Sequence, residues 1–437
     1  MRRKYSYRGI QAGLAVIILC LLCAGCSKAK VVIFPDESLQ AAIRKAINKP
    51  TGDIFDTDLV GTGFTQLFVR GKKITDLTGL EYCKDLTELE IRITKVNNLS
   101  ALSRLTKLRK VVLSDNKISN LSALTGLTGL TELDLRANEI SDISALAGLS
   151  NLEKLDLCAN KIVDISALAD LTNLKSLVFR FNNVSDISAL AKLTKLTDLS
   201  FHRNQVSDIN SLADLTNLQE LHLGWNRIRD INALASLTKL KTLMLGGNLI
   251  SDLSVLTDLT SIEQLGLQKI QTSDLSALEG LTNLKKLELN WSKISNFSAL
   301  ANLTNLSYLD LESNQMGDIS VLAGLTNLDT LKLRETQVSD ISVLAGLTNL
   351  THLELASNLI TDISVLAGLT KLSWLTLYKN QISNISALVT NTGIGSEDTV
   401  DLSDNPLRED ALCKDVPSLK ERGVRILPPP CSPSPRK

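Results

Sequence analysis

The side chains best suited to acid–base or metal chemistry are three histidines: His202, His222 and His352. A hydrolytic site or a surface metal pair could be built around the first two from their neighbours Asp198, Ser200 and Glu220. The sequence has no HExxH, no GxSxG, no Gly-rich phosphate loop and no cysteine–histidine spacing typical of zinc. All three histidines fall on outward-facing positions of predicted strands, where no pocket excludes water. We therefore predict no catalytic residues, no bound metal and no cofactor.

Large aromatic side chains are rare in this chain, which has 3 Trp, 5 Tyr and 8 Phe. Several of them fall on strand or rim positions that folding does not require, and exposed Trp, Tyr and Met are enriched at binding hot spots. Two groups are predicted to bind a ligand: Phe181, His202, His222, Trp225 and Met244 in the first, and Tyr308, His352, Trp374 and Tyr378 in the second. The alternative is that aromatics decorate a large sheet without any ligand.

A repeat of 22 residues must position these side chains. The block at 130–151, LTELDLRANEISDISALAGLSN, recurs with a strand centre every 22 residues from Leu67 to Leu375, without insertion or deletion. This is the leucine-rich-repeat template, in which each copy supplies a short strand and a return segment. One copy cannot bury its own apolar face, so the copies must stack. We predict a right-handed α/β solenoid, a horseshoe with a parallel concave sheet and short 3-10 or loop segments on its convex side.

Polar positions also recur within the repeat. An Asn after the strand, such as Asn138, is predicted to bond the backbone of the turn, and Asp142 is predicted to cap a short helical turn rather than bind calcium. Ile270 and Ser292 interrupt the Asn series in consecutive coils, which predicts a local irregularity. A column of arginines runs beside acidic residues: Arg70, Arg92, Arg136 and Arg180 beside Glu90, Asp134 and Asp156. A solvated salt-bridge ladder is favoured there over an anion site, which stays the alternative.

The two ends of the repeat array are predicted to be sealed. Residues 31–63 form a helical N-terminal cap with Asp36 as N-cap and an apolar face: Leu39, Ala42, Ile43, Ala46 and Ile47. The repeats occupy 64–388, about 15 coils. A three-residue slip puts Val400 at the next strand centre, within a C-terminal capping region at 389–427, and 428–437 is a short disordered tail.

The first residues are typical of an export signal. Basic residues precede an apolar run from Leu14 to Cys23, and Ala24, Gly25 and Cys26 resemble a bacterial lipobox. We predict a signal peptide at 1–25, a lipid on Cys26 and a linker at 26–30, with ordinary signal cleavage as the alternative. Cys83 is predicted to be a buried apolar filler and Cys158 a free thiol, while Cys413 and Cys431 could pair in an exported protein.

The chain resembles the internalin-type leucine-rich-repeat proteins of bacterial surfaces. The resemblance rests on Ile33-Phe34-Pro35-Asp36 with its helix, on Gly79-Leu80-Glu81-Tyr82 and on the 22-residue N-x-I-x-D-I-x-x-L period, over about 31–407. It implies an adhesin that grips a host protein in its concave face. No immunoglobulin-like module and no LPxTG signal accompanies the repeats, which leaves a surface binding module.

We therefore expect a monomeric, membrane-anchored lipoprotein of the cell envelope that faces the exterior or the periplasm. We expect it to bind a protein, or alternatively a glycan, and no nucleic acid, since 47 basic residues balance 47 acidic ones. The rivals are a structural envelope spacer without a specific ligand and an intracellular repeat protein similar to phosphatase regulators.

Overall fold

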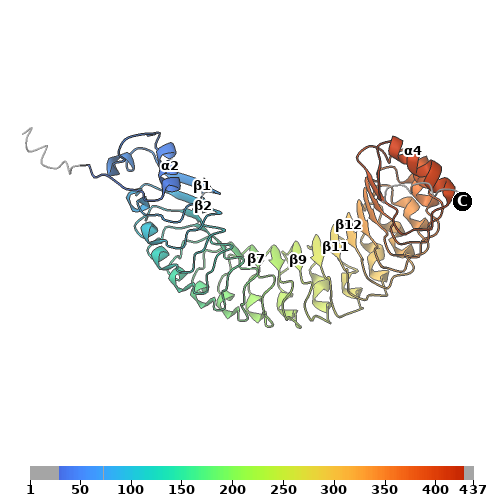
Figure 1. Ribbon diagram of the computed structural model, residues 1–437. Coiled ribbons are helices and arrows are strands. Elements are labelled where there is room, and N and C mark those ends of the chain that lie inside the picture. Colours follow the sequence, from blue (N-terminus) through green and yellow to red (C-terminus); the bar gives the residue numbers. More distant parts are fainter. Residues whose placement is uncertain (1–28, 72, 428–437) are drawn as a thin grey trace, which may run out of the picture.

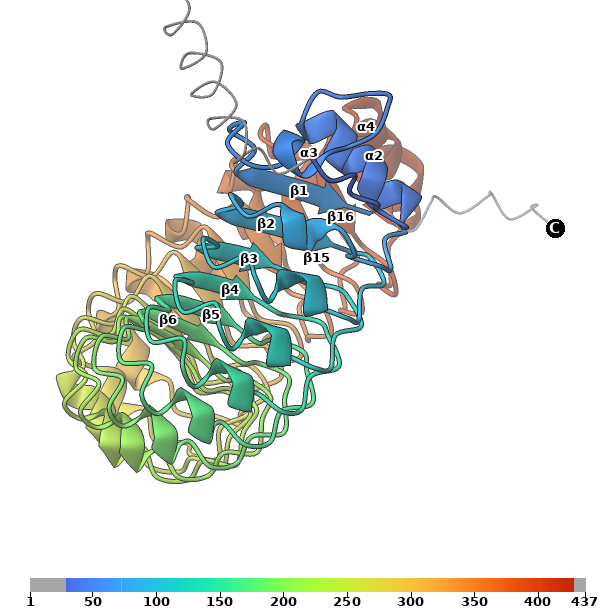
Figure 2. The ribbon, with the colours of Figure 1, turned by 90° about the vertical axis from the view of Figure 1, so that its left-hand side faces the viewer.

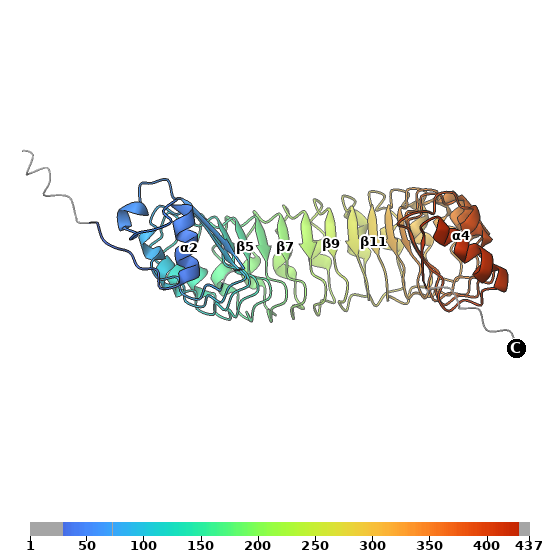
Figure 3. The ribbon, with the colours of Figure 1, turned by 45° about the horizontal axis from the view of Figure 1, so that its top comes forward.

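The computed structural model describes residues 29–71 and 73–427. They form one open parallel sheet of 17 strands that lines the inner side of a horseshoe (Figure 1). Short 3-10 helices line the outer side, as the turned view shows (Figure 2). Helix α2 (Glu37–Ala46) lies at one end of the array and α4 (Val416–Glu421) at the other (Figure 3). The predicted leucine-rich-repeat horseshoe is confirmed.

The strands are short, with three residues in all but the first two. They are β1 Gln66–Arg70, β2 Glu88–Arg92, β3 Lys110–Val112, β4 Glu132–Asp134, β5 Lys154–Asp156, β6 Ser176–Val178, β7 Asp198–Ser200, β8 Glu220–His222, β9 Thr242–Met244, β10 Gln264–Gly266, β11 Lys286–Glu288, β12 Tyr308–Asp310, β13 Thr330–Lys332, β14 His352–Glu354, β15 Trp374–Thr376, β16 Thr399–Asp401 and β17 Arg425–Leu427.

A 3-10 helix lies on the return path of each coil from β1 to β14, and one more, η1, precedes β1. These helices are η1 Asp56–Asp58, η2 Leu80–Tyr82, η3 Ser100–Leu102, η4 Ser122–Leu124, η5 Ser144–Leu146, η6 Ser166–Leu168, η7 Ser188–Leu190, η8 Asn210–Leu212, η9 Asn232–Leu234, η10 Ser254–Asp258, η11 Ser276–Leu278, η12 Ser298–Asn302, η13 Ser320–Gly324, η14 Ser342–Gly346 and η15 Ser364–Gly368. Near the C-terminal end lie α3 (Ser386–Thr390) and a π-helical segment, η16 (Ala411–Asp415), directly before α4.

Strand register follows the sequence period. Leu67 pairs with Leu89, and the same 22-residue step continues until Leu353 pairs with Leu375. The next pair joins Leu375 to Val400, so the three additional residues lie in the connection between the strands and the register of the sheet is kept. Any other change of length would move core leucines out of phase, because a strand presents alternate residues to opposite faces.

The core is a continuous column of apolar side chains inside the coils. In the repeat at 130–151, the inward residues are fully or almost fully buried: Leu130, Leu133, Leu135, Ile140, Ile143, Leu146 and Leu149. Two larger rings, Phe179 and Phe201, stack inside the coils of β6 and β7 with centroids 5.5 Å apart. Cys83 is also buried, as predicted, whereas Cys158 is half-buried.

The asparagine series bonds neighbouring coils to one another. Asn160 Nδ2 donates to the carbonyls of Leu135 and Leu157 at 3.1 and 3.0 Å, and its Oδ1 accepts from the Ile140 N–H at 3.0 Å. The amide thus satisfies buried backbone groups of two coils at once. On the return path, Asp142 Oδ1 accepts from the Ser144 N–H at 2.8 Å, which lowers the pKa of Asp142. Both predicted polar roles are confirmed.

The asparagine series is broken where the sequence breaks it. Ile270 has no side-chain amide to bond the turn. In the next coil Ser292 takes the place of the asparagine, and its Oγ donates long hydrogen bonds of 3.3 Å to the carbonyls of Leu267 and Asn290. Lys293, two residues after Trp291, takes a second positive φ of 55°. The predicted irregularity is therefore present in the turns, while β10 and β11 keep the regular register.

At the N-terminal end, Asp36 joins the cap to the first coils. One carboxylate oxygen accepts from the Leu39 N–H at 3.0 Å and the other from the Thr75 N–H at 2.9 Å. Leu39, Ala42 and Ile43 are buried as predicted, but Ala46 is exposed because the helix ends there.

At the C-terminal end, Leu419, Val424 and Ile426 are buried and close the last coil. No helix among the described residues is long and apolar enough to cross a membrane. Cys26, the signal segment, the tail and Cys431 lie outside the described residues.

Candidate ligand-binding site on the concave face

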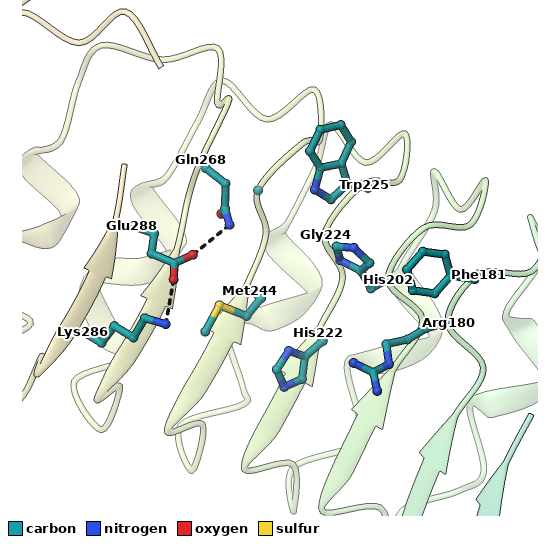
Figure 4. Close-up of a pocket in the computed structure, with 11 residues that line it drawn as sticks. Arg180, Phe181, His202, His222, Gly224, Trp225, Met244, Gln268, Lys286 and Glu288 are labelled. Atoms are coloured by element: carbon teal, nitrogen blue, oxygen red, sulfur yellow. Dashed lines mark hydrogen bonds and ion pairs between the residues drawn. The ribbon is translucent and has the colours of Figure 1, made fainter. Parts of the chain in front are cut away.

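A hollow of about 380 Å³ opens on the concave face between β6 and β11 (Figure 4). Its lining consists of Arg180, Phe181, His202, His222, Gly224, Trp225, Met244, Gly246, Gln268, Lys286 and Glu288. All five residues of the first predicted group are among them. These five residues come from the four consecutive coils of β6 to β9, so the 22-residue stacking of the strands brings them together.

Glycines allow side chains of other coils to lie flat against the backbone of this hollow. A Cβ at Gly224 would come within 2.9 Å of His202 Nδ1, and one at Gly266 within 2.6 Å of Met244 Sδ. The Gln268 amide lies over Gly246 in the same way, and the Trp225 ring lies over Gly247. The depth of the hollow therefore depends on positions that carry no side chain.

A row of alternating aromatic and cationic side chains runs along the rim of the hollow. It consists of Phe181, Arg203, Trp225, Lys269 and Trp291, and we call it the rim row. The Arg203 guanidinium lies 5.3 Å from the Phe181 ring and 5.2 Å from the Trp225 ring. Lys269 Nζ lies 4.7 Å from Trp225 and 5.3 Å from Trp291. Each cation is thus held between two rings at a distance typical of cation–π contacts.

The backbone of the rim row is left-handed. Phe181, Arg203, Trp225, Lys269 and Trp291 have φ between 55° and 59°. A left-handed backbone costs about 1–2 kcal/mol for a residue with a Cβ, and glycine avoids that cost. The same φ recurs in other coils with small residues such as Ala137, Ala159 and Ser313, so the turn does not explain why large side chains stand here. Phe181 and Trp291 are also 48% and 46% exposed.

His202 and His222 are half-buried in the hollow. Burial lowers the pKa of both imidazoles below the usual 6.5, so both are neutral at pH 7. The His202 ring packs 5.9 Å from the Phe181 ring at 59°. Ser200 Oγ is buried without a hydrogen-bond partner, so neither imidazole activates it. Within the described part of the chain, no group of three His, Cys, Asp or Glu side chains could hold a metal ion.

The second predicted group does not form one cluster. The His352 and Trp374 rings stack with centroids 5.4 Å apart and planes at 4°. Tyr378 lies under the Arg334 guanidinium at 5.6 Å, whereas Tyr308 packs against Lys286, at the edge of the hollow. Tyr308 begins β12, two coils before His352 on β14, and Trp374 and Tyr378 stand four residues apart in one coil, so the four separate into smaller contacts.

Acidic and basic side chains pair around this second group. Lys332 Nζ lies 3.1 Å from the Glu354 carboxylate, and Arg334 Nε lies 3.7 Å from Glu312. Burial raises the pKa of Asp310 to about 6. This part of the concave face is therefore electrically compensated.

The predicted salt-bridge ladder of arginines forms only in part. Arg92 pairs with Glu90 at 3.0 Å, and Arg136 pairs with Asp134 at 3.2 Å. Arg180 and Arg70 form no ion pair among the described residues, so the prediction is wrong for these two. The reason is local, because residues two apart in a strand share a face. Arg92 and Arg136 each follow an acid by two residues, whereas Arg180 follows Val178 and Arg70 follows Phe68.

Several lining residues escaped the sequence-based prediction. Gly224, Gly246 and Gln268 were not identified, nor was the pair Lys286–Glu288, in which Nζ lies 2.7 Å from the carboxylate. Arg203 and Lys269 were also missed, although they stand in the same repeat position as Trp225. Aligning the coils position by position would have revealed both the glycines and the alternating row.

Comparison with known proteins agrees with the architecture. The family model for leucine-rich repeats (2 copies) matches residues 106–148, 128–170, 150–192, 172–214, 216–259, 282–324, 304–346 and 326–368, more than half of the chain in total. No curated protein matches the chain.

Solved structures extend the likeness. An internalin from Listeria monocytogenes is 37% identical, with a TM-score of 0.66 over 78% of this chain and 94% of the internalin. A leucine-rich-repeat protein of Leptospira interrogans is 24% identical, with a TM-score of 0.74 over 82% and 94% of the two chains. The functional domain of InlJ from Listeria monocytogenes is 23% identical, with a TM-score of 0.70 over 86% and 83%. The last two show a shared fold. The chain therefore belongs to the leucine-rich-repeat family, as an internalin-like bacterial member.

Proposed function

We propose that the chain is a lipid-anchored protein of the cell envelope that binds a protein ligand in the hollow of its concave face. The rim row carries this proposal. Its large side chains stand at left-handed positions where glycine would serve the turn at lower cost, and two of them are about half exposed. Residues that folding does not require are best explained by a partner that covers them.

The hollow has the composition of a hot spot. Trp225 and Met244 offer apolar surface, while His202 and His222 offer neutral polar groups. Arg203 and Lys269 lie against Trp225 from coils on either side of it, so less of the ring face is open for a sugar to stack on. This favours a protein over a glycan. Internalin-like relatives support the same class of function.

Binding can be tested by crosslinking the exported part of the chain on intact cells and identifying what it captures. Three proteins are compared: the natural chain, a hollow variant with Trp225→Ala and Met244→Ala, and a matched variant with Trp374→Ala and Tyr378→Ala. We expect a captured protein that is lost only from the hollow variant, at unchanged melting temperature. Capture that is unchanged in all three would favour the spacer function, and loss from the matched variant would move the site to the second group.

The anchor rests on the lipobox-like residues that end at Cys26. Cells supplied with a labelled fatty acid should label the natural protein but not a Cys26→Ala variant, which should also leave the membrane fraction. Equal labelling of both forms would remove the lipid anchor from the proposal and leave the binding site intact.

A further inference from the structure

We propose that the segment bound in the hollow is acidic and that Arg180, Arg203 and Lys269 bind its carboxylates. This inference rests on the proposed function and names the chemistry of its ligand. The three cations lie along one side of the hollow, at the ends of the strands and on the rim. The inference has three supports: the cations have no carboxylate partner, two of them are already held in place, and the carboxylate of Glu288 in the lining is compensated.

The first support is a contrast in charge pairing along the concave face. Elsewhere on this face the cations mostly have carboxylate partners: Arg92, Lys110, Arg136, Lys286, Lys332 and Arg334. Among the described residues, Arg180, Arg203 and Lys269 form no ion pair. Arg70, Lys154 and Lys379 also form no ion pair among these residues, but Arg180, Arg203 and Lys269 are the three that stand beside the hollow.

The second support is that two of these cations are already held in place. Rings on both sides fix Arg203 and Lys269, so little side-chain freedom remains to be lost when a ligand binds. Stacking uses the faces of a guanidinium and leaves its N–H donors, which lie in the plane, for a carboxylate. Neither side chain donates a hydrogen bond within the described residues, so the donors are unused.

The third support is the state of the other charged groups around the hollow. Glu288 accepts from Gln268 Nε2 at 2.9 Å and pairs with Lys286 at 2.7 Å, so its charge is compensated. His202 and His222 are neutral at pH 7 because burial lowers their pKa. The lining thus keeps a net positive charge.

The acids Asp198 and Glu220 stand at the opposite end of their strands from the rim, where they line a second, smaller hollow with Arg180 and His222. Carboxylates of a ligand would therefore lie on the rim side and its apolar side chains over His222 and Met244. Arg180 and Lys269 are four coils apart, which at about 4.8 Å a coil is the span of roughly six extended residues. The occupant that fits is a short extended segment with acidic and apolar side chains in alternation.

The test uses a fluorescent peptide that alternates Asp or Glu with Phe or Leu, and a twin with Asn and Gln in place of the acids. Binding to the full mature chain is followed by fluorescence anisotropy. We expect the acidic peptide to bind and the twin to bind at least about tenfold more weakly, since charged hydrogen bonds are the stronger ones. Arg203→Gln and Lys269→Gln should each weaken binding about fivefold or more, and added salt should weaken it further.

Arg70→Gln is the matched control, because Arg70 shares the column of Arg180, also lacks an ion pair and lies outside the hollow. It should leave the affinity unchanged. Equal binding of the two peptides, or equal loss in the Arg70 and Arg203 variants, would overturn the inference. Tighter binding of a sulfated oligosaccharide with the same residue dependence would overturn it in favour of a glycan. If the captured partner is lost with Trp225→Ala but retained with both cation variants, this inference fails while the proposed function stands.

Discussion

Gly246→Ala should narrow the hollow without removing any of the side chains that line it. The three atoms nearest to a Cβ at this position all belong to the Gln268 side chain, with its Cγ at 2.8 Å. Gly246 does not have a positive φ, so alanine brings no backbone strain. The new methyl group must lift the Gln268 amide away from the backbone, into the space that a ligand would fill.

The substitution should change the free energy of unfolding less than it changes the free energy of binding. Lifting Gln268 loses its hydrogen bond to Glu288, worth about 0.5–1.5 kcal/mol, while alanine in place of a glycine in this turn gains about 0.4–1 kcal/mol because it restricts the unfolded chain. Stability should therefore change by less than about 1 kcal/mol. A misfit of one or two methyl-sized groups costs about 1–3 kcal/mol, so affinity should fall by roughly 5- to 150-fold.

Thermal unfolding by circular dichroism and anisotropy with the acidic peptide measure these two quantities. Gly148→Ala is the control, because a Cβ there meets nothing within 4 Å. An affinity within twofold of the natural chain for Gly246→Ala would refute the assignment of this hollow as the binding site. A large drop in melting temperature would instead refute the description of Gln268 as a side chain that moves easily.

Three further outcomes test the fold and its electrostatics. Deleting residues 152–173 removes one whole coil and should leave a folded, shorter protein by circular dichroism, whereas deleting 11 residues of that coil should abolish cooperative unfolding; equal melting of the two would contradict nearest-neighbour stacking. Asn160→Ala leaves several buried backbone groups of two coils without partners and should cost about 2–4 kcal/mol in denaturant unfolding, well above the 0.5 kcal/mol of a surface change. Asp310→Asn keeps an acceptor for the Glu312 N–H and removes a carboxylate whose pKa burial raises from 3.8 to about 6. Above pH 6 the native state bears the cost of burying that charge, so the variant should be more stable than the natural chain by about 3 kcal/mol. This gain in stability should shrink as the pH falls from 6 toward 3.8. A gain that does not depend on pH would contradict the raised pKa of Asp310.

The fold could be predicted almost completely from the sequence because one constraint repeats. Each coil must place the same leucines inward and keep register with both neighbours, so the 22-residue period fixes strand, core and turn together. Even the slip before Val400 was visible as a change of spacing.

The site could be predicted only in part. The period tells which coil a side chain belongs to, so Trp225 and His222 were correctly placed near each other. It does not tell which side chain reaches across a glycine, and the flat arrangement over Gly246 was therefore missed. The sequence does indicate that Arg180 has no ion-pair partner on its own strand, because the residue two positions before it is Val178 and not an acid.

The unbroken register also determines how the chain would respond to force. A pull between the N-terminal end and a ligand in the hollow passes through α2 and the coils of β1 to β11, and the coils beyond them carry none of it. If a coil were peeled from the array, its 22 residues would release about 75 Å of extended chain. Because each coil is bonded to its neighbours by much the same set of contacts, the tether would lengthen in equal steps while the hollow stayed folded.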